Sequence, residues 1–170
     1  MKTRPFPVIV CGLLLLLLLV MAAQISGKDK KSKKSHCSGG HPEQMCTAAN
    51  TCGSDGSPCV LEIKRTDGGE DASVTPNIAN FPKESVICIK TGTSVTWQGA
   101  GKNTGIMVDF GDASPFDPSG TIMGGSDRPV TVVAKTAGCF HYSVGACTPG
   151  SIYGMCGNSD FDLIVTSGAK

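Results

Sequence analysis

The cysteines constrain this chain more than any other residue type. Of nine cysteines in 170 residues, Cys11 lies in an apolar N-terminal run and the other eight fall between positions 37 and 156. An even set in a small exported chain indicates up to four disulfides. Structural zinc sites usually show Cys-x-x-Cys pairs, and this sequence has none. The disulfide candidates are Cys37, Cys46, Cys52, Cys59, Cys88, Cys139, Cys147 and Cys156.

The N-terminus has the features of a secretory leader. Lys2 and Arg4 precede an uncharged run from Phe6 to Ile25 that contains seven consecutive leucines, and small residues follow it. We therefore expect a signal peptide at 1–26. An uncleaved anchor is the alternative, because the run approaches the ~20 residues that span a bilayer. The protein is then expected to be secreted, periplasmic or held at the cell envelope, and it contacts a membrane only if the leader stays uncleaved.

Charge is distributed unevenly after the leader. Residues 27–35 form a basic linker, with five lysines between positions 28 and 34, and we expect a solvated tether. From Cys37 onward, eight Lys/Arg stand against thirteen Asp/Glu, a net charge of −5. An acidic domain with only 5% aromatic residues is unsuited to nucleic acid.

The segment 36–59 is rich in cysteine and poor in large apolar residues. Such a stretch cannot bury a core of its own and depends on cross-links. We interpret it as a disulfide-rich N-terminal extension. His36 and His41 flank Cys37 there, and they are either ordinary polar loop residues or a capture site for Cu(II) or Zn(II).

From residue 60 to 170, short apolar runs alternate with turn residues. The chain has 22 glycines and 10 prolines, which disfavours long helices. This pattern predicts an all-β domain, a Greek-key β-sandwich or barrel, in which only the loop 112–125 has any helical character. The predicted strands are 60–64, 86–90, 94–97, 106–110, 130–135, 140–144 and 161–166.

Three segments of this domain resemble the cupredoxins, the family of blue copper proteins. Val86-Ile-Cys-Ile-Lys-Thr-Gly-Thr-Ser-Val-Thr-Trp97 resembles their hairpin ending in Val-x-Trp. Gly138-Cys-Phe-His-Tyr-Ser-Val144 resembles a later strand, and Asp160-Phe-Asp-Leu-Ile-Val165 resembles the last one. The resemblance covers roughly residues 60–168. It implies a sandwich whose core holds Trp97, Phe110, Phe140 and Tyr142.

The family's copper ligands are not retained in this sequence. The resemblance places the first histidine at 103–105, where Asn, Thr and Gly stand, and the copper thiolate at Val144. Cys147 occupies the second histidine's position, and Met155 is a possible axial ligand. We therefore expect no type-1 copper site and no cofactor. The alternative is an atypical copper-binding, copper-delivery or electron-transfer protein with ligands drawn from His141, Cys147, Met155 and Cys139.

The resemblance also implies disulfide pairings. Cys88 and Cys139 both point away from the core on strands that the family places near each other, which implies a surface disulfide between them. Cys147 and Cys156 are expected to close the loop 145–157. The four cysteines of the segment 36–59 then pair among themselves, in an order left open.

No catalytic constellation is evident, so we do not expect an enzyme. His141 is the only histidine of the β region and is expected to be solitary and solvated, and there is no Gly-x-Ser-x-Gly motif. A binding or structural module remains, with an extracellular protein or polymer as its partner. Phe116, Ile122 and Met123 in the loop 112–126 are a candidate contact patch. The alternative is that Phe116 plugs the end of the sandwich.

Overall fold

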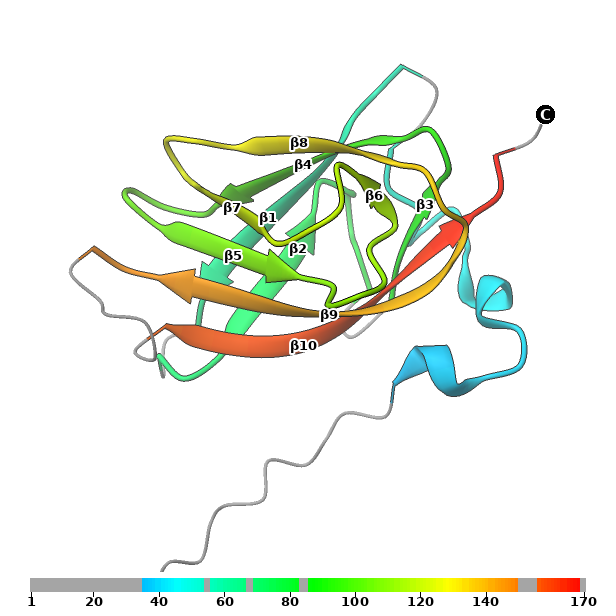
Figure 1. Ribbon diagram of the computed structural model, residues 1–170, viewed down its shortest axis with the longest axis horizontal. Coiled ribbons are helices and arrows are strands. Elements are labelled where there is room, and N and C mark those ends of the chain that lie inside the picture. The colour runs from blue at the N-terminus through cyan, green and yellow to red at the C-terminus, as the bar shows by residue number, and fades with distance from the viewer. Residues whose placement is uncertain (1–34, 54–55, 67–68, 83–85, 150–155, 169–170) are drawn as a thin grey trace, which may run out of the picture. The chain divides into compact units, whose positions relative to one another are not determined.

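The computed structural model describes residues 35–53, 56–66, 69–82, 86–149 and 156–168. All seven predicted strands are present, together with three others and two short 3-10 helices (Figure 1). The elements are η1 His36–Ser38, η2 Pro42–Met45, β1 Cys59–Arg65, β2 Ala72–Pro76, β3 Ile87–Lys90, β4 Ser94–Gly99, β5 Gly105–Asp109, β6 Phe116–Asp117, β7 Ile122–Gly125, β8 Val130–Ala134, β9 Gly138–Cys147 and β10 Gly157–Thr166.

The strands form two five-stranded sheets that pack face to face as a sandwich. One sheet has the order β2-β1-β4-β8-β6 and the other β3-β10-β9-β5-β7. Most neighbours are antiparallel, but β1 pairs in parallel with β4, and β3 pairs in parallel with β10. Strands distant in sequence therefore lie side by side, as β3 and the C-terminal β10 do in Figure 1. The predicted all-β sandwich is confirmed.

The segment 86–97 is not a hairpin, contrary to the expectation from the sequence. β3 and β4 belong to different sheets. The residues between them cross from one sheet to the other through Gly92, whose φ of 88° is a conformation that glycine adopts without strain. The loop 112–125 is also not helical, because it contains β6 and β7. β6 has only two residues, β7 is half glycine, and β2 contains one large apolar residue, Val74, and ends in a proline, so none of the three has the pattern of a strand.

Aromatic rings fill the space between the sheets. Trp97 is fully buried and meets Phe110, Phe116 and Tyr142 edge-on, with ring centroids 6.3, 6.1 and 5.7 Å away. Aromatic pairs favour such edge-to-face geometry, which adds to their area burial. Phe140 packs against this cluster but is only partly buried. The core predicted from strand alternation is thus largely confirmed.

The N-terminal segment covers the outer face of the second sheet. Cys88 and Ile164 point away from the main core, yet they are buried in a second apolar cluster with Val86, against which Met45 and Cys46 pack. The buried Asn50 fixes this arrangement, because its side-chain amide donates to the carbonyls of Met45 and Val86, both at 3.0 Å. The segment 36–59 is therefore part of the packed domain and not an independent extension.

The disulfides also connect the segment 36–59 to the strands of the sandwich. Cys37 is bonded to Cys139 on β9, and Cys46 is bonded to Cys88 on β3. The other two pairs are Cys52–Cys59 and Cys147–Cys156. The expectation that Cys37, Cys46, Cys52 and Cys59 pair among themselves is correct only for Cys52–Cys59.

The predicted Cys88–Cys139 pair is wrong. Both cysteines do point away from the main core, but Ile164 on β10 is the register partner of each, so β10 lies between their strands. Two strand spacings amount to about 10 Å, beyond the ~7 Å limit between Cα atoms of a disulfide.

Within the described part of the chain, no helix is long and apolar enough to cross a membrane.

Candidate functional site

The residues at the position of the family's copper site do not fit a type-1 copper ion. Val144 stands where the thiolate would be, and its side chain is buried in the core. Thr104 and Gly105 at the first histidine's position carry no metal-binding ring. Because a type-1 centre needs thiolate and imidazole donors together, no step of chemistry is assigned to such an ion here.

The two cysteine sulfur atoms proposed as alternative ligands are already bonded. Cys147 is joined to Cys156 as expected, and Cys139 is joined to Cys37, so neither supplies a thiolate while the disulfides are intact. Met155 lies outside the described residues. Among the residues that are described, no group of three or more His, Cys, Asp or Glu side chains is placed to hold a metal ion.

His141 faces outward as predicted, but it is not solitary. Its side chain is 58% exposed, and its Nδ1 lies 2.9 Å from Oδ1 of Asp162, its register partner on β10. His36 approaches the same carboxylate, with Nδ1 3.4 Å from Oδ2. His41, by contrast, lies against Glu43 at 3.3 Å. The structure therefore brings His36 together with His141, and not with His41.

Asp162 is the centre of this polar cluster. Its side chain is only 4% exposed, and it accepts hydrogen bonds from the hydroxyl of Ser35 and from the backbone N–H of His36 as well as from His141. Burial alone would raise the pKa of Asp162, but these hydrogen bonds and the nearby His141 outweigh burial and hold the pKa below its ordinary value. The carboxylate is thus ionised at neutral pH, and it fastens the start of the N-terminal segment to β10.

The three residues of the candidate contact patch, Phe116, Ile122 and Met123, are not exposed together. Phe116 is buried between Trp97 and Phe110, and Ile122 is buried in the same core, so both are corrections to the expectation that they face solvent. Strand alternation is the reason, since β6 and β7 turn these side chains inward. Met123 alone is exposed, at 71%. Phe116 therefore plugs the sandwich.

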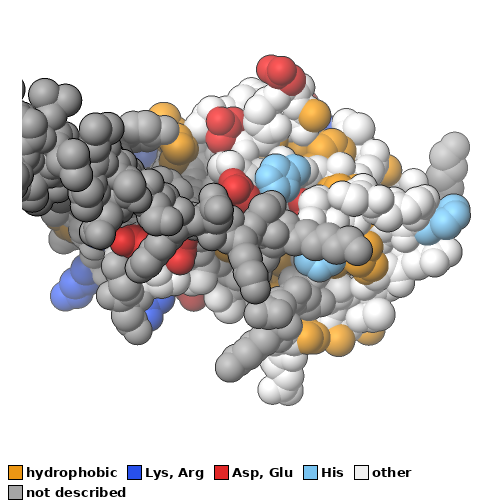
Figure 2. Space-filling model, turned by 90° about the horizontal axis from the view of Figure 1, so that it is seen from below, with side chains coloured by type: hydrophobic (Ala, Val, Ile, Leu, Met, Phe, Trp, Pro, Cys, Tyr) orange, Lys and Arg blue, Asp and Glu red, His pale blue; other side chains and the backbone are white. Residues whose placement is uncertain are grey.

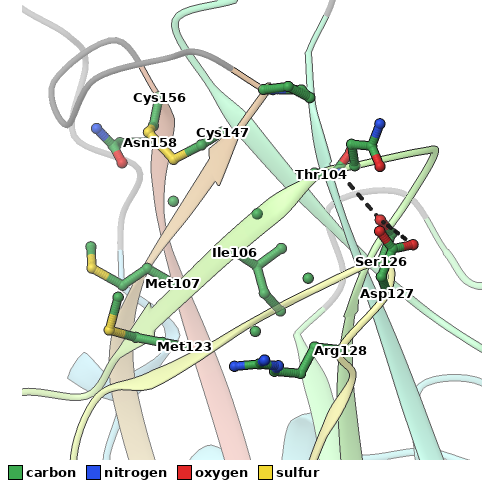
Figure 3. Close-up of a pocket in the computed structure, with 16 residues that line it drawn as sticks. Thr104, Ile106, Met107, Met123, Ser126, Asp127, Arg128, Cys147, Cys156 and Asn158 are labelled. Carbon is green, nitrogen blue, oxygen red and sulfur yellow. Dashed lines mark hydrogen bonds between the residues drawn. A yellow bond between two sulfur atoms is a disulfide. The ribbon is translucent and has the colours of Figure 1, made fainter.

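Met123 lies in an open groove on the outer face of β5, β7, β9 and β10. The groove has a volume of about 660 Å³, within the range of small-ligand pockets. Figure 3 shows Met107 and Met123 on one side of it, Arg128 and Asp127 on another, and Asn158 beside the Cys147–Cys156 disulfide. Thioethers, a guanidinium, a carboxylate and an amide thus surround one hollow.

Missing side chains create the groove. Gly105 and Gly145 stand on the outer face of adjacent strands and line its floor. A Cβ at Gly105 would meet no atom closer than 3.9 Å, so this glycine leaves open space. A Cβ at Gly157, behind the groove, would lie 2.2 Å from the carbonyl oxygen of Asp71, so that glycine serves close packing. Only the tertiary structure separates the two roles.

Sequence reasoning missed the groove and the histidine pair for different reasons. Glycine usually indicates a turn in a sequence, but Gly105, Gly124 and Gly145 lie within strands. The pairing of His36 with Asp162 joins residues 126 positions apart, and no local pattern reports such a contact. The alternation of Asp160, Asp162 and Ile164 in β10 was readable, and it does place Asp162 on the outer face.

The sequence matches no protein-family model and no curated protein. Among solved structures, an oxidised mutant of amicyanin has 15% identity and a TM-score of 0.34, covering 64% of this chain and 81% of its own. Lac15 from a marine microbial metagenome has 16% identity and a TM-score of 0.35, covering 66% of this chain and 33% of its own. A heme-copper terminal oxidase dimer, determined by cryo-EM, has 14% identity and a TM-score of 0.29, covering 92% of this chain and 95% of the matched chain. These neighbours are cupredoxins, the family that the sequence resembles, but at such scores they carry no argument about function.

Proposed function

We propose that this protein is an exported binding module, without a type-1 copper site and without catalytic activity, that holds an extended segment of an extracellular protein in the groove beside Met123. The observation that carries the proposal is the coincidence of an open groove with the end strand of a sheet. β7 is the last strand in its sheet, and Met123 on it is the exposed large hydrophobic residue among those that the structure describes. The four disulfides support an oxidising compartment outside the cytosol.

The hydrogen-bonding pattern of β7 supports the binding of a peptide as a further strand of its sheet. The N–H of Ser126 donates to the carbonyl of Thr104 at 3.0 Å, so these two residues form a hydrogen-bonded pair of the β5–β7 ladder. Antiparallel ladders alternate, which makes Met107 and Met123 a non-hydrogen-bonded pair whose backbone groups point away from each other. The N–H and C=O of Met123 therefore face away from β5. On that side the N–H of Gly125 already donates to the carbonyl of Arg128 at 2.9 Å, so we infer that a short extended peptide pairs with β7 at Met123, beyond this turn.

The groove supplies the side-chain contact that such a peptide needs. A residue paired with Met123 from outside carries its side chain on the outer face, next to the two methionines and above the glycine floor. Methionine is flexible and polarisable, so it adapts to apolar side chains of different shape. Arg128 and Asp127 at the margin offer polar contacts to the flanking residues of the peptide. We infer an extended segment with one apolar anchor residue.

The test uses a phage-displayed random peptide library, selected on the full chain and counter-selected on Gly105→Val. A Cβ at position 105 would lie no closer than 3.9 Å to another atom, and the β-branched side chain of valine suits a strand and adds volume at the groove floor. The proposal expects peptides that bind the wild type and lose at least tenfold affinity for the variant. Their binding should shift the ¹³C-methyl signals of Met107 and Met123, while Met45, packed on the second apolar cluster, should stay unshifted as an internal control.

Two outcomes count against the proposal. Selected peptides that bind the wild type and Gly105→Val equally, or that shift Met45 as strongly as Met123, show that the groove is not the binding site. A selection that enriches no peptide shows that extended segments are not what the groove holds.

A further inference from the structure

His36 and His141 come from distant parts of the chain and share one buried carboxylate. Nδ1 of His141 lies 2.9 Å from Oδ1 of Asp162, and Nδ1 of His36 lies 3.4 Å from Oδ2. The two rings stand at opposite oxygens of a side chain that is 4% exposed, while their own side chains are 58% and 40% exposed. Figure 2 shows histidine side chains exposed at separate places on one face of the molecule, with acidic side chains beside one of them.

The carboxylate determines which ring nitrogens remain available. A neutral imidazole carries its proton on one nitrogen and a lone pair on the other. Nδ1 of His141 lies within hydrogen-bond distance of the ionised Asp162, so we assign its proton to Nδ1. His36 is held by its backbone N–H, which donates to Asp162, and its Nδ1 lies 3.4 Å from Oδ2. The Nε2 lone pair of His141 is then left for another partner, and the ring of His36 lies at the other oxygen of the same carboxylate. Metal-binding histidines usually have this arrangement, with one nitrogen on the metal and the other donating to a carboxylate.

Covalent bonds hold the two histidines in place. Cys37, the neighbour of His36, is bonded to Cys139, which lies two residues before His141 on the same face of β9. Residues i and i+2 of a strand share a face, so the disulfide ties the two rings to one surface. The hydroxyl of Ser35 and the backbone N–H of His36 fix the carboxylate between them. The disulfide and these hydrogen bonds thus hold the backbones that carry the two rings before a ligand arrives.

We propose that the Nε2 atoms of His36 and His141 bind a divalent transition-metal ion such as Cu²⁺ or Zn²⁺, with Asp162 as the positioning residue behind them. Imidazole nitrogen is a preferred donor for both ions, and Cu²⁺ binds such sites most tightly. Water completes the coordination at this exposed face. The exposed carboxylate of Asp160, two residues away on the same face of β10, adds negative charge nearby. The site is separate from the groove beside Met123 and does not depend on the function proposed for it.

The experiment titrates the full chain with CuCl₂ and with ZnCl₂ and compares three asparagine variants. His36→Asn and His141→Asn remove an imidazole. We expect the fold to be retained, because Asn keeps an N–H donor near Nδ1 at position 141, and the backbone N–H at position 36 still donates to Asp162. His41→Asn is the matched control, because His41 is an exposed histidine of the same segment that faces Glu43 instead. We expect each of the first two variants to weaken Cu²⁺ binding at least tenfold and His41→Asn to change it less than twofold.

A spectroscopic readout distinguishes ligation from an indirect effect. Pulsed electron paramagnetic resonance of the Cu²⁺ complex detects the remote nitrogen of each bound imidazole, so we expect two imidazoles in the wild type and one in either site variant. Asp162→Asn should retain both imidazoles and lower the affinity by about tenfold or more, as carboxylates behind metal-binding histidines usually do. A wild-type complex with fewer than two imidazoles, or equal affinity in His41→Asn and His141→Asn, overturns the proposal.

Discussion

Cys46 is bonded to Cys88, a residue of β3 that is buried although it points away from the main core. Their Cα atoms lie 5.7 Å apart, and the bond spans 42 positions of sequence. The N–H of Cys52 also donates to the carbonyl of Cys88, at 2.7 Å, so the N-terminal segment pairs with the edge of the sheet that it covers. The second sheet is therefore covered at β3, whereas β7 is the last strand at its other end, where the proposed binding groove lies.

Removing the Cys46–Cys88 bond should cost more stability than removing Cys147–Cys156. The first closes a loop of 42 positions and the second a loop of 9. Loop-closure entropy gives about 4 kcal/mol for the first and about 2.5 kcal/mol for the second. Urea unfolding of the two double-alanine variants measures the difference. A larger loss for Cys147–Cys156 would mean that the N-terminal segment is not part of the cooperative fold.

The ionised carboxylate of Asp162 should stabilise the folded protein at neutral pH and lose this effect in acid. The pKa of Asp162 in the folded protein lies below its ordinary value of 3.8, so the carboxylate contributes stability above that value and the contribution disappears as pH falls through the lower, folded pKa. We expect Asp162→Asn to be less stable than wild type at pH 7, with the gap closing as pH falls well below 3.8. Urea unfolding across this range checks the sign. A gap that is independent of pH would show that the ionised form is not what matters.

Phe116 should behave as a core residue. Its ring packs against Trp97 at 6.1 Å and Phe110 at 5.3 Å between centroids. Phe116→Ala should lower the free energy of unfolding by roughly 3–5 kcal/mol, the usual cost of such a cavity. Met123→Ala, the exposed counterpart from the same loop, should change it by less than about 0.5 kcal/mol. Similar effects of the two substitutions would restore the contact-patch interpretation.

The hydroxyl of Tyr142 is a buried polar group with no hydrogen-bond partner among the described residues. Tyr142→Phe should leave stability unchanged or raise it by about 1 kcal/mol, since it removes an unsatisfied group. Burial, and secondarily the charge of Asp162, raises the pKa of Tyr142 far above its ordinary value of 10.0. The unfolded chain therefore loses this proton first, and wild type should lose stability above pH 10 relative to the variant. Chemical unfolding at pH 9 and pH 11 tests both statements.

The sequence by itself determined the class of fold and the direction of most side chains. Period-two alternation placed Ile87, Trp97 and Tyr142 inside and turned Cys88 and His141 away from the main core, because a strand fixes which face each residue takes. The resemblance to the cupredoxins implied the bond between Cys147 and Cys156, which close a short loop, and the structure confirms it.

The order of strands was decided only by the tertiary structure. β10 lies between β3 and β9, and this separates Cys88 from Cys139 and sends each to a cysteine of the N-terminal segment. The same order brings His36 to the carboxylate that contacts His141 and makes β7 the last strand of its sheet. Alternation is a local property of the backbone, whereas strand order depends on contacts between residues a hundred positions apart, such as Cys37 and Cys139, and no short stretch of sequence encodes them.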